Sequence, residues 1–199
     1  LARRFQITSP QVFFIATYSS NRMISPATIN ILRSESFDQR VMKALTLYLN
    51  STLTLFQLLS LFVETRGAWV RFDKDVWAGV YVPDLEALAN NPRALEEASR
   101  AFDRVVRASE TLQPLYERVS SGSEVQREID EVAIKMLGMP WGNEALNTLY
   151  GTIKSELDAL QRILEESQKE RKSKKAEESE DEEESSETIQ TSLNKWINK

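Results

Sequence analysis

The chain has 199 residues, of which 41% are hydrophobic, and its formal net charge is −5 at pH 7. This length suits one domain with an appendage or two small domains, and the apolar content is enough for a core. Cysteine and histidine are both absent. Disulfides, thiolate metal sites, a thiol nucleophile, the Ser-His-Asp triad and the commonest metal ligand are therefore excluded. No calcium-binding D-x-D-x-D-G loop occurs either, so we expect no metal site.

Charge is unevenly distributed along the sequence. Residues 1–84 hold nine Lys and Arg against six Asp and Glu, a net charge of +3, whereas residues 85–164 and 165–199 carry −4 each. The acidic total argues against a protein that coats nucleic acid without specificity. The acidic total does not exclude a protein that reads nucleic acid through a basic face in its N-terminal part.

The N-terminal part is predicted to be a small mixed α/β unit. Residues 12–18 are rich in β-branched and aromatic side chains, as in a strand, and residues 28–32 offer a second strand after a polar turn. From residue 37 to 63, apolar residues recur at three- and four-residue steps, which predicts one long helix. Gly67 is placed to end that helix through a left-handed cap.

The segment after this helix should alternate short strands and turns. We expect a strand over 69–72, a helical turn over 73–78 and a last short strand over 79–82. Asp84 is placed to cap a short helix over 85–89. These elements complete the mixed unit.

The second half of the chain is predicted to be helical. Pro92 suits a helix start, and apolar residues then follow a heptad spacing up to Val119. Pro114 should kink or split this helix because it removes an intrahelical hydrogen bond. A shorter helix over 125–136 should follow, closed by Gly138.

A second long heptad stripe runs from Leu146 to Leu164. Two long amphipathic helices joined through a short one should pack antiparallel, as a hairpin or a three-helix bundle. We therefore expect Phe102 and Leu157, one on each seam, to be buried against the opposite arm. The alternative is that the seams form a dimerisation arm, which would make the chain a homo-oligomer.

The predicted fold class is α+β and predominantly α, with a small mixed α/β domain followed by an antiparallel helical hairpin or bundle. The predicted domains are residues 1–90 and 91–165, and residues 166–199 form a charged, low-complexity tail with a short amphipathic end. No membrane span or signal peptide is visible, so we expect no membrane contact and a cytoplasmic location. Because the first residue is Leu1 rather than Met, we expect the chain to be part of a longer protein.

Several segments, taken in order over roughly residues 5–165, resemble one region of a known family. They are the Asn50-Ser51-Thr52 step in an apolar helix, the turn at Arg66-Gly67, the VPDL segment Val82–Leu85, and the run from Arg127 through Asp130 to Gly138 with its R-x-x-D pattern. This order resembles the C-terminal target-recognition and helical region of adenine-specific DNA methyltransferases from restriction-modification and related defence systems.

The resemblance implies that the chain recognises a sequence in double-stranded DNA, beside a catalytic methyltransferase domain in the same or a partner chain. The parent protein would transfer a methyl group from S-adenosylmethionine to adenine. The chain itself has no consecutive prolines and no Gly-x-Gly loop. It therefore lacks both the loop that grips a flipped base and a loop for the cofactor. We expect neither catalytic residues nor a cofactor site within it.

Reading DNA requires Arg or Lys for guanine edges, Asn or Gln for adenine edges, and cations for phosphates. Besides Arg3 and Arg4, the N-terminal half offers Asn21, Arg22, Arg33, Arg66, Arg71 and Lys74, mostly at turns or element ends. Arg22 and Arg66 are the best placed, and replacing either by alanine should weaken binding by roughly 1–3 kcal/mol if it reads a base edge. The simpler interpretation is that such residues are ordinary surface charges.

Some residues have a simpler structural interpretation than a functional one. Trp69 and Trp77 could stack on bases, but their apolar neighbours favour core positions. Asn50 lies inside an apolar helix, so we expect it to fix helix packing by buried hydrogen bonds rather than to read a base. Two other functions remain open, namely a protein-protein interaction module that uses the helical hairpin, and a separate DNA-specificity subunit.

Overall fold

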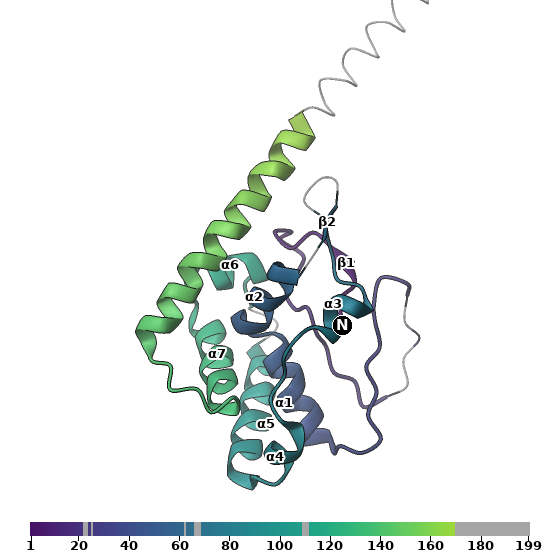
Figure 1. The fold of residues 1–199 in the computed structure, drawn as a ribbon, viewed down its shortest axis with the longest axis vertical. Coiled ribbons are helices and arrows are strands. Elements are labelled where there is room, and N and C mark those ends of the chain that lie inside the picture. The colour runs from purple at the N-terminus through teal and green to yellow at the C-terminus, as the bar shows by residue number, and fades with distance from the viewer. Residues whose placement is uncertain (22–23, 25, 62, 66–68, 109–111, 170–199) are drawn as a thin grey trace, which may run out of the picture.

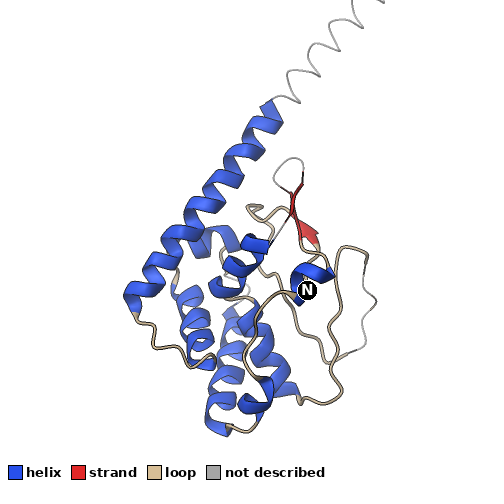
Figure 2. Ribbon diagram, viewed as in Figure 1, coloured by secondary structure: helices blue, strands red, loops and turns tan. Residues whose placement is uncertain are grey.

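The computed structural model describes residues 1–169 except 22–23, 25, 62, 66–68 and 109–111. The described part is mainly helical and contains one small antiparallel sheet (Figures 1 and 2). The predicted fold class, α+β and predominantly α, is confirmed.

The apolar stretch predicted to be one helix is two helices. α1 spans Gln39–Leu49 and α2 spans Thr52–Leu61, and the two are bent by 62° at the break between them. Asn50 and Ser51 account for the break because their side chains bond to backbone groups outside a continuous helical ladder. The Asn50 amide binds the backbone of residues 15–16, and the Ser51 hydroxyl caps α2 by accepting a backbone N–H. The single-helix prediction is therefore wrong at this step.

Three segments predicted to be strands are mostly irregular. Residues 12–18 and 79–82 form no ladder, and residues 28–32 contribute a single β-bridge. Much of the backbone of the first two is bonded by side chains of other elements rather than by a neighbouring strand. Some of the apolar side chains that suggested strands contribute to the core instead, since Ile15 and Val80 are both buried.

The sheet has three strands in the spatial order β1-β3-β2, and neighbouring strands are antiparallel. They are β1 (Arg4–Phe5), β2 (Val63–Thr65) and β3 (Trp69–Arg71). The strand predicted over β3 is confirmed. The other two were missed because two or three residues carry almost no periodicity. Gly67, the predicted helix cap, lies outside the described residues.

Local capping signals predicted two of the next three helix starts correctly, those at Leu85 and Pro92. α3 spans Lys74–Ala78, α4 spans Leu85–Ala89 and α5 spans Pro92–Arg107. The Asp84 carboxylate accepts hydrogen bonds from two backbone N–H groups in the first turn of α4. Pro92 is the first residue of α5, where its missing N–H costs nothing.

Pro114 splits the heptad segment, as its missing N–H predicted. α6 spans Leu115–Ser121 and begins directly after this proline, α7 spans Glu124–Met136, and a last helix covers residues 143–169. Gly122 ends α6 with a φ of 58°, a left-handed conformation that glycine adopts without strain.

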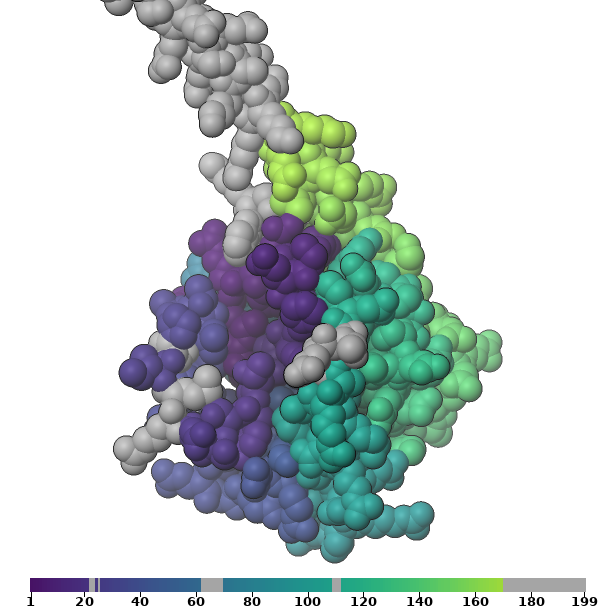
Figure 3. Space-filling model, turned by 180° about the vertical axis from the view of Figure 1, so that it is seen from behind, coloured from purple at the N-terminus to yellow at the C-terminus, as the bar shows by residue number. Residues whose placement is uncertain are grey.

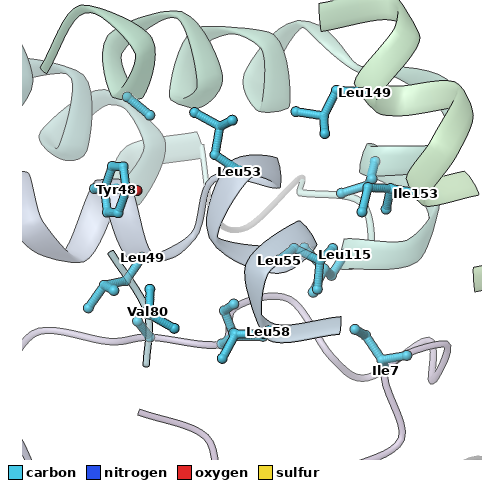
Figure 4. Close-up of a cluster of buried hydrophobic side chains, with 14 of the residues drawn as sticks. Ile7, Tyr48, Leu49, Leu53, Leu55, Leu58, Val80, Leu115, Leu149 and Ile153 are labelled. Carbon is cyan, nitrogen blue, oxygen red and sulfur yellow. The ribbon is translucent and has the colours of Figure 1, made fainter. Parts of the chain in front are cut away.

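Two hydrophobic clusters form the core. The first gathers side chains from the N-terminal loop, α1, α2, α6 and the last helix, and Figure 4 shows Leu58, Leu115 and Ile153 among them. The second lies between α1, α5 and α7 and includes Val41 and Ala98. A fully buried Leu or Ile contributes roughly 1.5–3 kcal/mol relative to an exposed one, so both clusters stabilise the fold substantially.

The predicted pairing of the two heptad seams is wrong. Phe102 of α5 packs on the second cluster and meets the Tyr18 ring edge to face, with centroids 6.1 Å apart, whereas Leu157 of the last helix is buried in the first cluster. α5 lies against α1 and α7 instead. The physical reason is that the apolar stripe of α1 covers the α5 seam, which leaves the last helix to cover α2 and α6. Both seams therefore pack within the chain itself, although Phe102 is only partly buried.

Both clusters cross the boundary predicted between residues 90 and 91. Helices α1 and α2, from predicted domain 1–90, share them with α5, α7 and the last helix, from predicted domain 91–165. The far end of the last helix extends beyond the other helices (Figure 1). The first residues of the predicted tail, 166–169, continue that helix, and the remainder lies outside the described residues.

Candidate nucleic-acid interface

Two arginines stand side by side on the small sheet. Arg4 of β1 is directly opposite Arg71 of β3 in the antiparallel register, and both residues are exposed. Their neighbours Phe5 and Val70 form the next pair, so they point to the other side, where Val70 is fully buried. Like charges directly opposite one another destabilise a sheet. This pair therefore gathers positive charge on the exposed side of the sheet.

Asp73 links the pair to a third arginine. One carboxylate oxygen accepts from Arg3 Nε at 2.9 Å, and the other lies 2.6 Å from Arg71 Nε. The hydrogen bond from Arg3, followed by that from Arg71, holds the pKa of the Asp73 carboxyl below its ordinary value. The Arg3 and Arg71 side chains remain 40% and 49% exposed, so these ion pairs add little stability and leave the cations accessible. Together with Lys74, exposed at the start of α3, Arg3, Arg4 and Arg71 make up the basic face.

Contacts with distant residues hold the first strand in place. The Phe72 N–H donates to the Arg3 carbonyl at 2.7 Å, and the Trp77 indole N–H donates to the Ala2 carbonyl at 2.9 Å. The Phe72 ring meets the rings of Phe5 and Trp77 edge to face, with centroids 5.5 and 6.1 Å away. Trp77 thus packs within the fold, as the sequence predicted, and it supports the backbone that carries the arginines.

The predicted DNA contacts fall into two sets. Arg71 and Lys74 belong to the basic face. Asn21 and Arg33 instead line a cavity of about 440 Å³ between the loop of residues 16–35 and α1. Arg22, Arg66 and the side chain of Trp69 lie outside the described residues.

Asn50 is 5% exposed and uses both ends of its amide. Its Oδ1 accepts from the N–H groups of Ile15 and Ala16 at 2.9 and 3.2 Å. Its Nδ2 donates to the carbonyls of Ala16 and Thr46, at 2.7 and 2.8 Å. Asn50 therefore joins the N-terminal loop to the end of α1, which confirms the predicted packing role.

A buried carboxylate connects α2, α7 and the last helix. Asp130 accepts from the Thr52 N–H at 2.6 Å, from the Thr52 hydroxyl at 2.7 Å and from the Tyr150 hydroxyl at 2.8 Å. The Gln126 amide nitrogen lies 3.4 Å from each carboxylate oxygen. Burial raises the pKa of the Asp130 carboxyl to about 6, although these hydrogen bonds oppose the shift. Asp130 thus caps the start of α2 from another helix.

Arg118 of α6 extends this polar cluster toward the N-terminal loop. It is 1% exposed and donates to the Gln126 side-chain oxygen at 3.3 Å and to the carbonyls of Gln113 and Phe13 at 3.1 and 3.0 Å. Because all three acceptors are neutral, burial lowers the pKa of the guanidinium to about 10, while the charge of Asp130 opposes the shift. Figure 3 shows the N-terminal segment lying directly against the segment that carries Arg118.

Sequence reasoning singled out Thr52 and Asp130 but did not predict that they bond to each other, and it overlooked Arg118. The available signal was weak, because Arg118 and Asp130 each stand beside a buried apolar residue in a helix, namely Val119 and Ile129. A charge next to such a residue can equally point to solvent, so only the fold reveals that both are buried.

Among the described residues, no group of three or more potential metal ligands comes together. In the same part of the chain, no single helix is both long and apolar enough to cross a membrane, although α1 and α2 pass that test when taken together across their bend. Comparison with protein-family models, with curated proteins and with solved structures finds no significant match. Function is therefore inferred from the residues themselves.

Proposed function

We propose that this chain recognises double-stranded DNA as the target-recognition part of a cytoplasmic, adenine-specific DNA methyltransferase. A catalytic domain in the same or a partner chain would transfer the methyl group from S-adenosylmethionine. The chain contributes binding rather than catalysis, because its sequence has neither a double-proline loop for a flipped base nor a Gly-x-Gly loop for the cofactor.

The observation that carries the proposal is the pair of arginines, Arg4 and Arg71, held opposite each other on an exposed sheet. The neighbouring carboxylate of Asp73 is shared between Arg71 and Arg3, and both arginine side chains remain partly exposed. A DNA backbone supplies negative charge, and arginine binds phosphate through parallel hydrogen bonds. A short antiparallel ribbon also fits the major groove of B-DNA. Arg71, on the central strand, is our candidate for a base contact, and the rest of the basic face would hold phosphates.

A second contact supports the resemblance to the methyltransferase family. The Asn-Ser-Thr step and the R-x-x-D segment are far apart in the sequence, yet Asp130 accepts two hydrogen bonds from Thr52. The contact gives the two segments a structural reason to occur in the same chain, because it joins the start of α2 to α7. This contact supports the motifs as one structural unit, and the basic face supports DNA as the ligand.

Replacing Arg4 and Arg71 together by alanine should weaken binding to duplex DNA and reduce its dependence on salt. Because Arg4 is assigned to a phosphate and Arg71 to a base edge, the slope of log K against log salt should fall by about 1, since each phosphate contact contributes roughly one unit. Fluorescence anisotropy with a labelled random-sequence duplex, repeated at several salt concentrations, measures both quantities.

The matched control replaces Arg100 and Arg107, two exposed arginines of α5, by alanine and so removes the same charge from another element. We expect this control to retain most of the affinity and the salt slope. If both double variants lose the same affinity for DNA, binding depends only on the total charge of the chain, and the basic face is not the interface.

S-adenosylmethionine should not bind the chain in a saturable manner. The chain lacks both loops that methyltransferases use around the cofactor and the target base. Isothermal titration calorimetry with S-adenosylmethionine tests this expectation, and a saturable heat signal would place the cofactor site within the chain.

A further inference from the structure

Asp73 stands at the capping position of a helix, but its side chain does not cap that helix. It precedes α3 with an extended backbone, at φ −69° and ψ 175°, and its carboxylate bonds to none of the described N–H groups in the first turn. Asp38 and Asp84 hold the same position before α1 and α4, and each accepts from two backbone N–H groups. Such bonds stabilise a helix start. The Asp73 carboxylate therefore lacks a favourable local contact and makes a different one instead.

Both oxygens of the Asp73 carboxylate are turned to arginines. Oδ1 accepts from Arg3 Nε at 2.9 Å, and Oδ2 lies 2.6 Å from Arg71 Nε. Arg71 and Asp73 are two residues apart in extended chain, and Phe72 between them is fully buried. Their side chains therefore lie together on the exposed side. One carboxylate thus holds two guanidinium groups through their Nε atoms.

The contact with Asp73 engages one of the five N–H groups of the Arg71 guanidinium. Within the described part of the chain, no other group bonds to this side chain, which is 49% exposed. Arg3 differs, because its Nη1 also donates to the Ala27 carbonyl at 3.1 Å. A guanidinium that is held through Nε still presents its two Nη groups as a pair of parallel donors. A side chain that is already held in place loses less rotamer entropy when it binds a ligand.

We propose that Asp73 is a positioning residue that orients Arg71 to read guanine, an inference that rests on the proposed function. The major-groove edge of guanine carries two adjacent acceptors, N7 and O6, which match two parallel N–H donors. Adenine presents one acceptor and one donor there, thymine presents an acceptor beside a methyl group, and cytosine presents a donor. The Asp73 side chain is 35% exposed and negatively charged, so it disfavours a phosphate beside Arg71 and favours an uncharged base edge.

The test compares the full wild-type chain with Asp73→Asn, whose side chain has the same size but no charge and one acceptor oxygen instead of two. Random-sequence duplexes are selected with the wild type, and guanines of the enriched motif are then replaced one at a time by adenine. At one guanine, this change should weaken wild-type binding about 5- to 150-fold, the range that corresponds to about 1–3 kcal/mol for one bidentate contact. Asp73→Asn should lose most of this discrimination, yet bind random-sequence duplexes at least as tightly as the wild type. Arg71→Ala should lose the same discrimination, and the double variant should lose no more.

Asp75→Asn is the matched control, because it removes the same charge from an exposed residue in the first turn of α3. It should keep the wild-type discrimination, and all variants should keep the wild-type Tm, since exposed ion pairs add little stability. If Asp73→Asn discriminates like the wild type, or if the enriched motif contains no guanine, the inference fails while the proposed function stands. If the wild type enriches no motif, both fail. An equal loss of preference at every position of the motif, together with a lower Tm, would assign Asp73 to the support of the fold instead.

Discussion

Replacing Arg118 by alanine should lower the free energy of unfolding by about 3–5 kcal/mol, a large part of the roughly 5–15 kcal/mol that stabilises a typical domain. The variant leaves the buried acceptors of Phe13, Gln113 and Gln126 without their donor. It also removes the positive charge that favours ionised Asp130. Urea denaturation followed by circular dichroism measures the loss.

Arg100→Ala is the control for this experiment. The Arg100 side chain is 70% exposed and pairs with Glu96 one turn earlier on α5, so its removal should cost no more than about 0.5 kcal/mol. A loss for Arg118→Ala as small as that of the control would show that the guanidinium does not secure the N-terminal loop.

Replacing Asp130 by alanine should also cost about 3–5 kcal/mol. The Thr52 N–H and hydroxyl, the Tyr150 hydroxyl and the Gln126 amide would all lose an acceptor in a buried place. Asp130→Asn should cost much less, because the amide oxygen still accepts and the two hydroxyl groups can turn to accept from the amide N–H groups. Equal losses in the two variants would mean that the negative charge, rather than the acceptor geometry, is what the site requires.

The same carboxyl group should make stability depend on pH in a defined direction. Because burial raises the pKa of Asp130 to about 6, the folded state retains a proton that the unfolded state has lost above about pH 4. The stabilisation that this retained proton gives the folded state is complete below about pH 4 and is lost as the pH rises through about 6. The free energy of unfolding of the wild type should therefore fall, relative to that of Asp130→Asn, by an amount on the order of 3 kcal/mol between pH 4 and 7. If the wild type instead becomes more stable relative to Asp130→Asn as the pH rises over this range, the hydrogen bonds outweigh burial and lower the pKa of Asp130.

Two buried residues, Arg118 and Asn50, also matter for the proposed interface. Arg118 bonds to the carbonyl of Phe13, and Asn50 bonds to the backbone of residues 15–16. This loop follows β1, which carries Arg4, so the position of the basic face depends on polar contacts made deep in the fold. Loss of stability and loss of DNA binding should be separable, because the basic-face arginines are exposed and the buried residues are not.

The parts of the fold that were predictable from the sequence have local causes. Asp84 and Pro92 act on the backbone within a few residues of themselves, so local rules predicted their helix starts correctly. The failures have distant causes. Residues 12–18 have the composition of a strand, but their backbone is bonded to Asn50 and Arg118, whose positions depend on the whole fold.

The candidate site divides in the same way. Arg71 and Lys74 were both predicted as candidate DNA contacts, because each lies at the end or start of a predicted element. The pairing of Arg71 with Arg4 depends on β1, which is too short to detect.

The central claim, that the chain reads double-stranded DNA, is tested most directly by repeated selection of the chain against a library of random-sequence duplexes. Bound duplexes are recovered at moderate salt concentration and sequenced after each round. We expect one short sequence motif to be enriched, and we expect the chain's affinity for that motif to fall as salt rises while remaining above its affinity for scrambled duplexes. Recovery of duplexes with no shared sequence, or of none at all, would contradict the claim.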